Sequence, residues 1–385
     1  LLRDEALHEF DRSTIGLVVL VLTAAMAAAT MTVSFVRAEL TLLLGSMVWV
    51  GVAIGGFADA QVLPLLRPLA SAAVAAAALL GYRFTIADRD RRYIRQAFSL
   101  YLPVAVVDRM VNEGRVPTLG GETRELTIWF SDIADFTSLS ENMAPDHLVR
   151  LLNDYFSEMT EILERHGGFV DKFIGDAILA VFGAPVADPE HARHAVEAAL
   201  ACKRRLAEMG RELGREAEPS LVARIGVNSG RVLVGNIGSR RRFNYTVMGD
   251  AVNLASRLEG ANKNYGTQIL VGETTVTGCA DHVKFREIDL VRVVGRATPV
   301  RIFEPLGLIG VVQATEEAAI LDSRIEVFSA ALEAFRAGRF AVAAEGFRSL
   351  AGVDAVAAGY AKRAQALVES PPEQAWDGTT NLTEK

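Results

Sequence analysis

Two aspartates stand where a sheet could bring their carboxylates together. Asp132 follows the β-rich segment 125–131, and Asp176 lies in a tight turn between the short apolar runs 169–174 and 177–182. Two carboxylates at one sheet edge repel each other unless a cation lies between them, and such oxygen ligands suit Mg²⁺ held together with substrate phosphates. Each aspartate alone is also common as a turn residue or a helix-start residue. The pattern indicates a candidate metal and phosphate site, with ordinary turn positions as the alternative.

Three further stretches contain groups that are typical of phosphate sites. Residues 133–138 form a turn into the next helix, where exposed backbone N–H groups bind phosphate well. The basic cluster 240–242 is either a solvated turn or a contact to a triphosphate. The Gly-rich stretch 226–238 lacks the strand, loop and helix context of a dinucleotide-binding fingerprint. We therefore interpret its glycines as hairpin geometry.

The elements that must position these groups alternate in a definite order. Apolar residues at helical spacing predict two amphipathic helices, and short β-rich runs predict five strands around them. Strand, helix, two strands, helix, strand is the order of a ferredoxin-like α+β sheet with helices on one face. The segments are 125–131, 145–166, 169–174, 177–182, 192–209, 221–227 and 231–237, the last two joined by a turn at Ser229 and Gly230.

Three apolar runs precede residue 85 and contribute strongly to the 50% hydrophobic content of the chain. They cover residues 15–36, 40–58 and 69–84, and a helix of about 20 apolar residues spans the hydrocarbon core of a bilayer. Buried helices of a soluble domain are the alternative. A cluster of arginines follows the third run, and positive charge stays on the cytoplasmic side. We predict three transmembrane helices within residues 15–85 of a multi-pass inner-membrane or plasma-membrane protein whose catalytic part is cytoplasmic.

The flanking segments complete the predicted organisation. The chain starts at Leu1 without an initiator Met, so we interpret it as a fragment or processed product whose first 14 residues are an extracytoplasmic remnant. Residues 86–119 are expected to form a linker helix, either a solvated juxtamembrane helix or a dimeric signalling linker. Residues 307–370 are expected to form a helical tail similar to one tetratricopeptide unit, which cannot bury its own face alone. The polar end, 371–385, is expected to be disordered.

Charge and cysteine content exclude some classes of function. The formal net charge of -7 offers no basic field for binding nucleic acid. The two cysteines, Cys202 and Cys279, are far apart and have no Cys neighbour at metal-ligand spacing. They cannot form a disulfide framework, which fits a reducing compartment, and we interpret both as small buried apolar residues.

Four motifs stand out within residues 120–306: FSDIADFT (130–137), GGFVDKFIGDAILAVFG (167–183), GVNSGRVLVGNIG (226–238) and NYTVMGDAVNLASRLE (244–259). Together they resemble the class III adenylyl and guanylyl cyclase catalytic domain. The three apolar runs, the Arg-rich linker and the tail also resemble bacterial cyclases with an extracytoplasmic CHASE2 sensor, which would precede Leu1. The resemblance implies a membrane-anchored enzyme of signal transduction that converts ATP to cyclic AMP and pyrophosphate.

The resemblance implies a metal centre and a purine site. Asp132, Ile133 and Asp176 would hold two Mg²⁺ or Mn²⁺ ions, which activate the ribose 3′-hydroxyl and clamp the triphosphate. Lys172 would donate to a ring nitrogen of adenine, and the hydroxyl of Thr246 would accept from the exocyclic amine. Guanylyl cyclases of the family typically place Glu and Cys at these two positions, so the pair favours ATP.

The resemblance also implies a transition-state pair. Asn253 would orient the ribose, and Arg257 would stabilise the charge that develops on the α-phosphate. Their spacing of four places both on one face of a helix. Other residues expected to contact the substrate are Phe136, Thr137, Arg241 and Arg296.

In this family the aspartates come from one subunit and the Asn and Arg from the other, so we expect a homodimer with two complete sites. Two other functions remain open at this point. One is a guanylyl or relaxed-specificity cyclase, and the other is a membrane receptor whose cyclase domain only binds nucleotide or a partner. The sequence departs from the usual motif at Ala134 and Asp135, where Arg or Glu and then Gly are more common. We expect this departure to be tolerated.

Overall fold

The computed structural model divides the chain into two compact units, Leu1–Asn112 and Glu113–Lys385. Apart from residues 107–108 and 118–119, the linker helix expected over 86–119 lies outside the residues that the structure describes. The described residues are 8–9, 13, 16–17, 19–21, 23–24, 35–58, 61–63, 65–82, 107–108, 118–212, 221–293, 298–310, 316–372 and 376–382.

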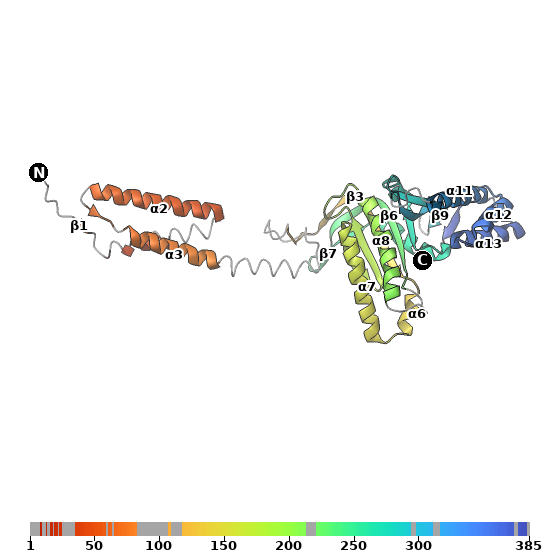
Figure 1. The fold of residues 1–385 in the computed structure, drawn as a ribbon, viewed down its shortest axis with the longest axis horizontal. Helices are drawn as coiled ribbons and strands as arrows, with labels where there is room; N and C mark the ends of the chain where they lie inside the picture. Colours follow the sequence, from red (N-terminus) through yellow and green to blue (C-terminus); the bar gives the residue numbers. More distant parts are fainter. Residues whose placement is uncertain are drawn as a thin grey trace. The chain divides into compact units, whose positions relative to one another are not determined.

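The described part of the first unit contains two long helices and one short strand pair (Figure 1). The helices are α2 (Phe35–Ala58) and α3 (Leu66–Tyr82). Strands β1 (His8–Glu9) and β2 (Gln61–Val62) pair in parallel.

These helices do not support the predicted membrane spans. Helix α3 has 17 residues, which is about 26 Å at 1.5 Å per residue and shorter than a hydrocarbon core of about 30 Å. Among the residues that the structure describes, no helix is long and apolar enough to cross a membrane. The prediction of three transmembrane helices within residues 15–85 is therefore wrong, and so is the multi-pass localisation derived from it.

The described part of the second unit is built on one sheet of nine strands, in the order β11-β9-β10-β8-β6-β3-β5-β4, with β7 paired to β6. The strands are β3 (Gly120–Ile133), β4 (Gly168–Ile174), β5 (Ala177–Phe182), β6 (Ala223–Gly238), β7 (Phe243–Met248), β8 (Ile269–Gly272), β9 (Val283–Val293), β10 (Val300–Leu308) and β11 (Thr380–Leu382). The helices are α6 (Phe136–Glu141), α7 (Pro145–Arg165), α8 (His191–Glu212), α9 (Asp250–Tyr265), α10 (Glu273–Thr277), α11 (Glu316–Arg336), α12 (Phe340–Leu350) and α13 (Ala355–Glu369).

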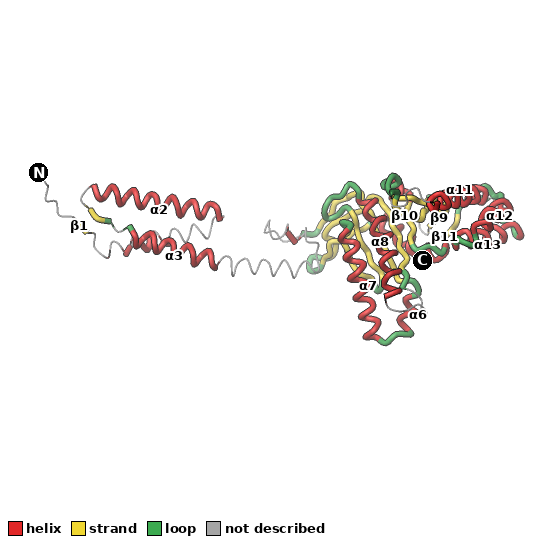
Figure 2. Tube along the Cα trace, in the orientation of Figure 1, coloured by secondary structure: helices red, strands yellow, loops and turns green. Residues whose placement is uncertain are grey.

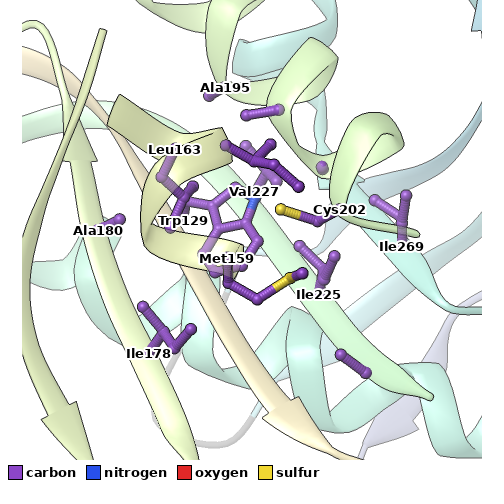
Figure 3. Packing of buried hydrophobic residues seen from close by; sticks show 14 of the residues in the cluster. Trp129, Met159, Leu163, Ile178, Ala180, Ala195, Cys202, Ile225, Val227 and Ile269 are labelled. Carbon is purple, nitrogen blue, oxygen red and sulfur yellow. The ribbon is translucent and has the colours of Figure 1, made fainter. Parts of the chain in front are cut away.

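Helices cover both faces of the central strands. Alternate residues of β3 point to opposite faces, as the period of two in a strand requires. Trp129 of β3 packs with Met159 of α7 and Cys202 of α8 in one buried cluster, which Figure 3 shows. Ile128, its neighbour in β3, packs instead with Ala255 of α9. The predicted α+β order of β3, α7, β4, β5, α8 and β6 is confirmed, and Cys202 and Cys279 are buried free thiols as expected.

The predicted turn at Ser229 and Gly230 is wrong. Strand β6 runs unbroken through both residues and pairs with β3 in antiparallel register, with Gly230 opposite Leu126. Glycines of this stretch leave room for α9 to pack closely on β6, and they do not turn the chain. A Cβ at Gly226 would lie 2.1 Å from the carbonyl oxygen of Ala255. The interpretation of these glycines as hairpin geometry therefore fails for Gly226 and Gly230, since a close helix also requires glycine.

The C-terminal helices lie at the β9 end of the sheet (Figure 2): α11 packs against β9, α13 against α9, and α12 against α11 and α13. Phe328, Phe335 and Tyr360 form a buried aromatic cluster with Tyr265 of α9. The buried carboxylate of Asp289 in β9 accepts from the hydroxyl of Tyr265 at 2.7 Å and that of Thr380 at 2.5 Å. The tail therefore buries its apolar face on the sheet and on the end of α9.

The expected disorder of residues 371–385 is wrong for Thr380–Leu382, which form β11 and pair in parallel with β9. Trp376 anchors this segment to the tail. Its ring lies 5.3 Å from the ring of Phe335 and 5.3 Å from that of Phe340, and its Nε1 donates to the Phe335 carbonyl oxygen at 3.0 Å.

Trp376→Ala is expected to lower the free energy of unfolding by about 2–4 kcal/mol, because it removes the ring that closes the aromatic cluster. Trp376→Phe retains a ring and should recover more than half of the loss. Urea unfolding of the three proteins, followed by circular dichroism, checks this. Equal stability of wild type and Trp376→Ala would show that the segment is not packed in solution.

Candidate active site

The fold brings Asp132 and Asp176 side by side. Asp132 lies next to the end of β3, and β3 pairs with β5, so the turn before β5 meets the end of β3. Gly175 adopts a φ of +66° in that turn, which a residue without Cβ adopts easily. The backbone N–H of Ile133 donates to Asp176 Oδ2 at 3.2 Å. All three residues of the predicted metal site are thus adjacent.

The surroundings of Asp132 disfavour its charged form. Burial, followed by the hydrogen bond and the negative charge of Asp176, raises the pKa of Asp132 to about 7. Arg224, which lies opposite Asp132 in the register of β6, opposes this rise together with the N–H of Ile133. A divalent cation between the two carboxylates would offset their repulsion and favour the ionised form of Asp132.

The donor set fits a hard cation such as Mg²⁺. Two half-buried carboxylates supply oxygen ligands, and Mg²⁺ usually takes one or two carboxylates together with waters and substrate phosphates. Within the described ranges, no group of three or more His, Cys, Asp or Glu gathers at metal-binding distance. The rest of a coordination shell would therefore come from water, backbone oxygen or phosphate.

A second pair joins two strands that are distant in sequence. Lys172 of β4 donates from Nζ to Thr246 Oγ1 of β7 at 3.0 Å. The ring of Phe169 packs edge-on against Tyr245 with centroids 5.9 Å apart, so the same strands also touch through aromatic side chains. The two residues predicted to contact the purine therefore lie together within one chain.

Asn253 and Arg257 lie on α9, four residues apart, as the sequence predicts. Asn253 is exposed and Arg257 is half-buried. In the part of the chain that the structure describes, no hydrogen bond or ion pair joins either side chain to Asp132, Asp176, Lys172 or Thr246.

The remaining predicted substrate residues are scattered. Phe136 opens the short helix α6, and its side chain packs against the core. Thr137 beside it is exposed, as is Arg241 in the turn between β6 and β7. Arg296 lies outside the described residues.

Residues 121–303 match the family described as the adenylate and guanylate cyclase catalytic domain. Adenylate cyclase 1 of Rhizobium meliloti (strain 1021) is 39% identical over 219 residues, which are 57% of this chain and 33% of that protein. Adenylate cyclase of Anabaena cylindrica is 36% identical over 217 residues, 54% of this chain and 42% of that protein. The similarity to adenylate and guanylate cyclases lies in this part of the chain.

A solved structure also resembles the cyclase domain. The adenylyl cyclase CyaB from P. aeruginosa is 34% identical, with a TM-score of 0.46, and the match covers 49% of this chain and 96% of that one. The chain spans less than half the length of the Rhizobium meliloti and Anabaena cylindrica proteins.

Three charged residues lie close to the predicted site residues although the sequence motifs did not single them out: Asp171, Arg224 and Glu259. Asp171 lies beside Lys172, with its side chain 1% exposed. Glu259 of α9 lies with Oε1 3.6 Å from Nε of Arg224, which faces Asp132. Asp171 interrupts an apolar strand, and Glu259 closes the motif that carries Asn253 and Arg257, so both had a signal in the sequence.

Glu259 is expected to make the stability of the cyclase domain depend on pH. Burial, followed by the negative charge of Asp132, raises its pKa from 4.5 to about 7. Because the folded state binds the Glu259 proton more tightly, this proton adds to the free energy of unfolding. The contribution is complete below pH 4.5 and is lost as the pH rises through 7. Glu259→Gln should therefore gain on the order of 2 kcal/mol of stability relative to wild type between pH 5 and pH 8.

Urea unfolding in EDTA at both pH values tests this prediction. Glu161→Gln, at an exposed position of α7, is the matched control and should show no such change. An identical stability difference between wild type and Glu259→Gln at pH 5 and pH 8 would contradict the raised pKa.

Proposed function

We propose that this chain is an adenylate cyclase that forms 3′,5′-cyclic AMP and pyrophosphate from ATP at a homodimer interface, in signal transduction. The observation that carries the proposal is the adjacent carboxylate pair of Asp132 and Asp176 in a domain of the cyclase family. The relatives from Rhizobium meliloti and Anabaena cylindrica are named adenylate cyclases, which supports ATP as the substrate. The CHASE2 sensor resemblance depended on the three predicted spans, so the proposal does not include it.

In the proposed mechanism, Asp132 and Asp176 would hold Mg²⁺ or Mn²⁺, and the backbone N–H of Ile133 fixes the position of Asp176. Bound there, two such ions would lower the pKa of the ribose 3′-hydroxyl and neutralise charge on the phosphates. The 3′-oxygen attacks the α-phosphorus, its proton passes to solvent, and the bond to the β-phosphate oxygen breaks to release pyrophosphate. Asn253 orients the ribose, and Arg257 stabilises the added charge on the α-phosphate.

The base and the phosphates would be held by other residues. Lys172 donates to a ring nitrogen of adenine, and Thr246 accepts from the exocyclic amine. We assign contacts to the triphosphate to the turn at Phe136 and Thr137 and to the exposed side chain of Arg241. Arg296 is assigned the same role on the sequence motif alone.

Two observations support a shared site in a homodimer. Asn253 and Arg257 have no described bond to the aspartates of their own chain, which fits a role in the partner's site. Large apolar side chains are also exposed beside the purine pair, on β4, β6 and β7, and a partner would cover them. They are Phe173 (47% exposed), Ile174 (51%), Leu233 (41%) and Met248 (54%).

Cyclic nucleotide formation by the purified chain tests the proposal. ATP and GTP are each supplied with Mg²⁺ or Mn²⁺, and the products are separated by chromatography, with EDTA as the metal-free control. Cyclic AMP that forms from ATP only when metal is present supports the proposal. Preferential formation of cyclic GMP would identify a guanylyl cyclase. No product from a confirmed dimer would leave a domain that only binds nucleotide or a partner.

A further inference from the structure

A buried carboxylate lies behind the pair that we propose contacts the purine. Asp171 precedes Lys172 in β4, and its side chain is only 1% exposed. The register between β4 and β5 shifts at this residue, because Val170 pairs with Ala180 while Lys172 pairs with Leu179. Asp171 is thus the extra residue of a β-bulge, a feature that redirects side chains in a strand.

The contacts of Asp171 fix the direction of one hydroxyl. The hydroxyl of Thr246 donates to Asp171 Oδ2. Lys172 Nζ donates to Thr246 Oγ1 at 3.0 Å and lies 3.6 Å from Asp171 Oδ1. An ionised carboxylate only accepts and a lysine ammonium only donates, whereas a hydroxyl can do either. Between these two neighbours, the Thr246 proton points to Asp171.

Thr246 Oγ1 then has one lone pair left, since the other accepts from Lys172. Toward any further partner this oxygen is an acceptor with no proton to donate. Adenine presents an amino group at its 6-position, which donates to such an oxygen. Guanine presents a carbonyl oxygen there, and two acceptors facing each other leave both unsatisfied.

The ammonium of Lys172, 3.6 Å from Oδ1, favours the ionised form of Asp171 against the cost of burial. Burial raises the pKa of this carboxyl, and three neighbours oppose the rise: the hydroxyl of Thr246, the ammonium of Lys172 and the backbone of Val247. Oδ1 is buried and accepts no hydrogen bond, and the ammonium of Lys172 lies 3.6 Å from it. The carboxylate is therefore oriented by one hydrogen bond and one ion pair, with Oδ2 toward the threonine and Oδ1 toward the lysine.

We propose that Asp171 is a specificity-positioning residue: it holds the Thr246 hydroxyl as an acceptor, so that the site selects a 6-amino purine over a 6-oxo purine. The inference rests on the proposed function, because it requires that Lys172 and Thr246 face the base. Asp171 does not touch the nucleotide and acts only through Thr246. If Asp171 only stabilised the fold, its substitution would change kcat/KM for all nucleotides by the same factor.

The Asp171→Asn substitution tests this because the amide has nearly the shape of the carboxylate but reverses the direction of the hydrogen bond with Thr246. The amide oxygen remains toward Lys172, and the amide N–H₂ takes the place of Oδ2 and donates to Thr246. The threonine proton is then free to point toward the base, where it matches a carbonyl. For the full chain we expect the ratio of kcat/KM for ATP to that for GTP to fall by about tenfold or more.

Inosine triphosphate isolates the position on the base. It shares the 6-oxo group of GTP but lacks the 2-amino group, so kcat/KM for both should rise together relative to ATP. In a Thr246→Val background, Asp171→Asn should leave these ratios unchanged, because no hydroxyl remains to be oriented. Asp154→Asn, an exposed site on α7, controls for the loss of one negative charge.

The outcomes separate this inference from the proposed function. A wild type with no activity on any nucleotide would refute the proposed function and the inference with it. If the wild type is active but Asp171→Asn changes the kcat/KM ratios by less than twofold, the inference alone is overturned. The same holds if the ratio of ATP to GTP changes while the ratio of ATP to inosine triphosphate does not. If Asp171→Asn fails to fold, Thr246→Ser and Thr246→Val decide. The serine variant should retain the ATP preference and the valine variant should lose it, and the reverse or no difference would overturn the inference.

Discussion

Asp132→Asn is expected to lower cyclic AMP formation by about 10³-fold or more and to make the metal-free chain more stable. Both effects have the same cause. The carboxylate that would hold a cation beside Asp176 is costly to ionise without one, as its pKa of about 7 shows. An amide is a poor ligand for Mg²⁺, but it carries no charge and can donate to Asp176.

The sign of the stability effect follows from the raised pKa. The folded state binds the proton of Asp132 more tightly than the unfolded state, in which the pKa is near 3.8. The favourable contribution is complete below pH 3.8 and disappears as the pH rises through 7. At pH 8 in EDTA, Asp132→Asn should exceed wild type by on the order of 1–3 kcal/mol, and at pH 5 by less.

Urea unfolding at the two pH values gives the stability, and chromatography of the product gives the activity. Asp154→Asn, at an exposed position on α7, should change neither. A stable variant that retains activity would remove Asp132 from the metal site. An inactive variant that is less stable at pH 8 than wild type would show that the carboxylate pair is not under electrostatic strain.

The aspartate pair could be predicted because it depends on local pattern and strand adjacency. A strand that ends at Asp132 and a tight turn that contains Asp176 meet once the first strand lies beside the hairpin. That neighbour relation is a property of the ferredoxin-like order, which hydrophobic periodicity indicates. The placement of Lys172 and Thr246 at one purine site was implied only by the family resemblance, since no periodicity places β7 near β4.

Other features depend on packing that a linear pattern does not contain. Ser229 and Gly230 resemble a turn, yet the structure needs glycine there because α9 lies close to β6. The charge of Asp171 within an apolar strand is visible in the sequence, but the bulge that directs its side chain inward to Thr246 is not. The polar C-terminal segment gives no sign in its composition that β9 has a free edge for Thr380–Leu382 to join.

Mixing two inactive variants distinguishes a site shared between two chains from a site within one chain. Only a shared site predicts that the mixture recovers activity. Asp132→Asn removes a metal ligand, and Arg257→Ala removes the transition-state charge, with a loss of about 10²–10³-fold in kcat. If each site takes its aspartates from one chain and Arg257 from the other, a mixed dimer holds one intact site and one doubly damaged site. Neither pure variant has an intact site.

Mixing equal amounts with full subunit exchange gives half mixed dimers, so activity should recover to about a quarter of wild type. The two variants are mixed in urea at a concentration that only dissociates the dimer, then diluted, and cyclic AMP is measured against each variant treated alone. A mixture of Asp132→Asn with Asp176→Asn is the matched control. Both changes fall in the same half of the site, so no mixed dimer is complete. Recovery in the control would show that the aspartates do not act together. No recovery in the first mixture, with exchange verified by differently tagged chains, would show that Arg257 serves the site of its own chain.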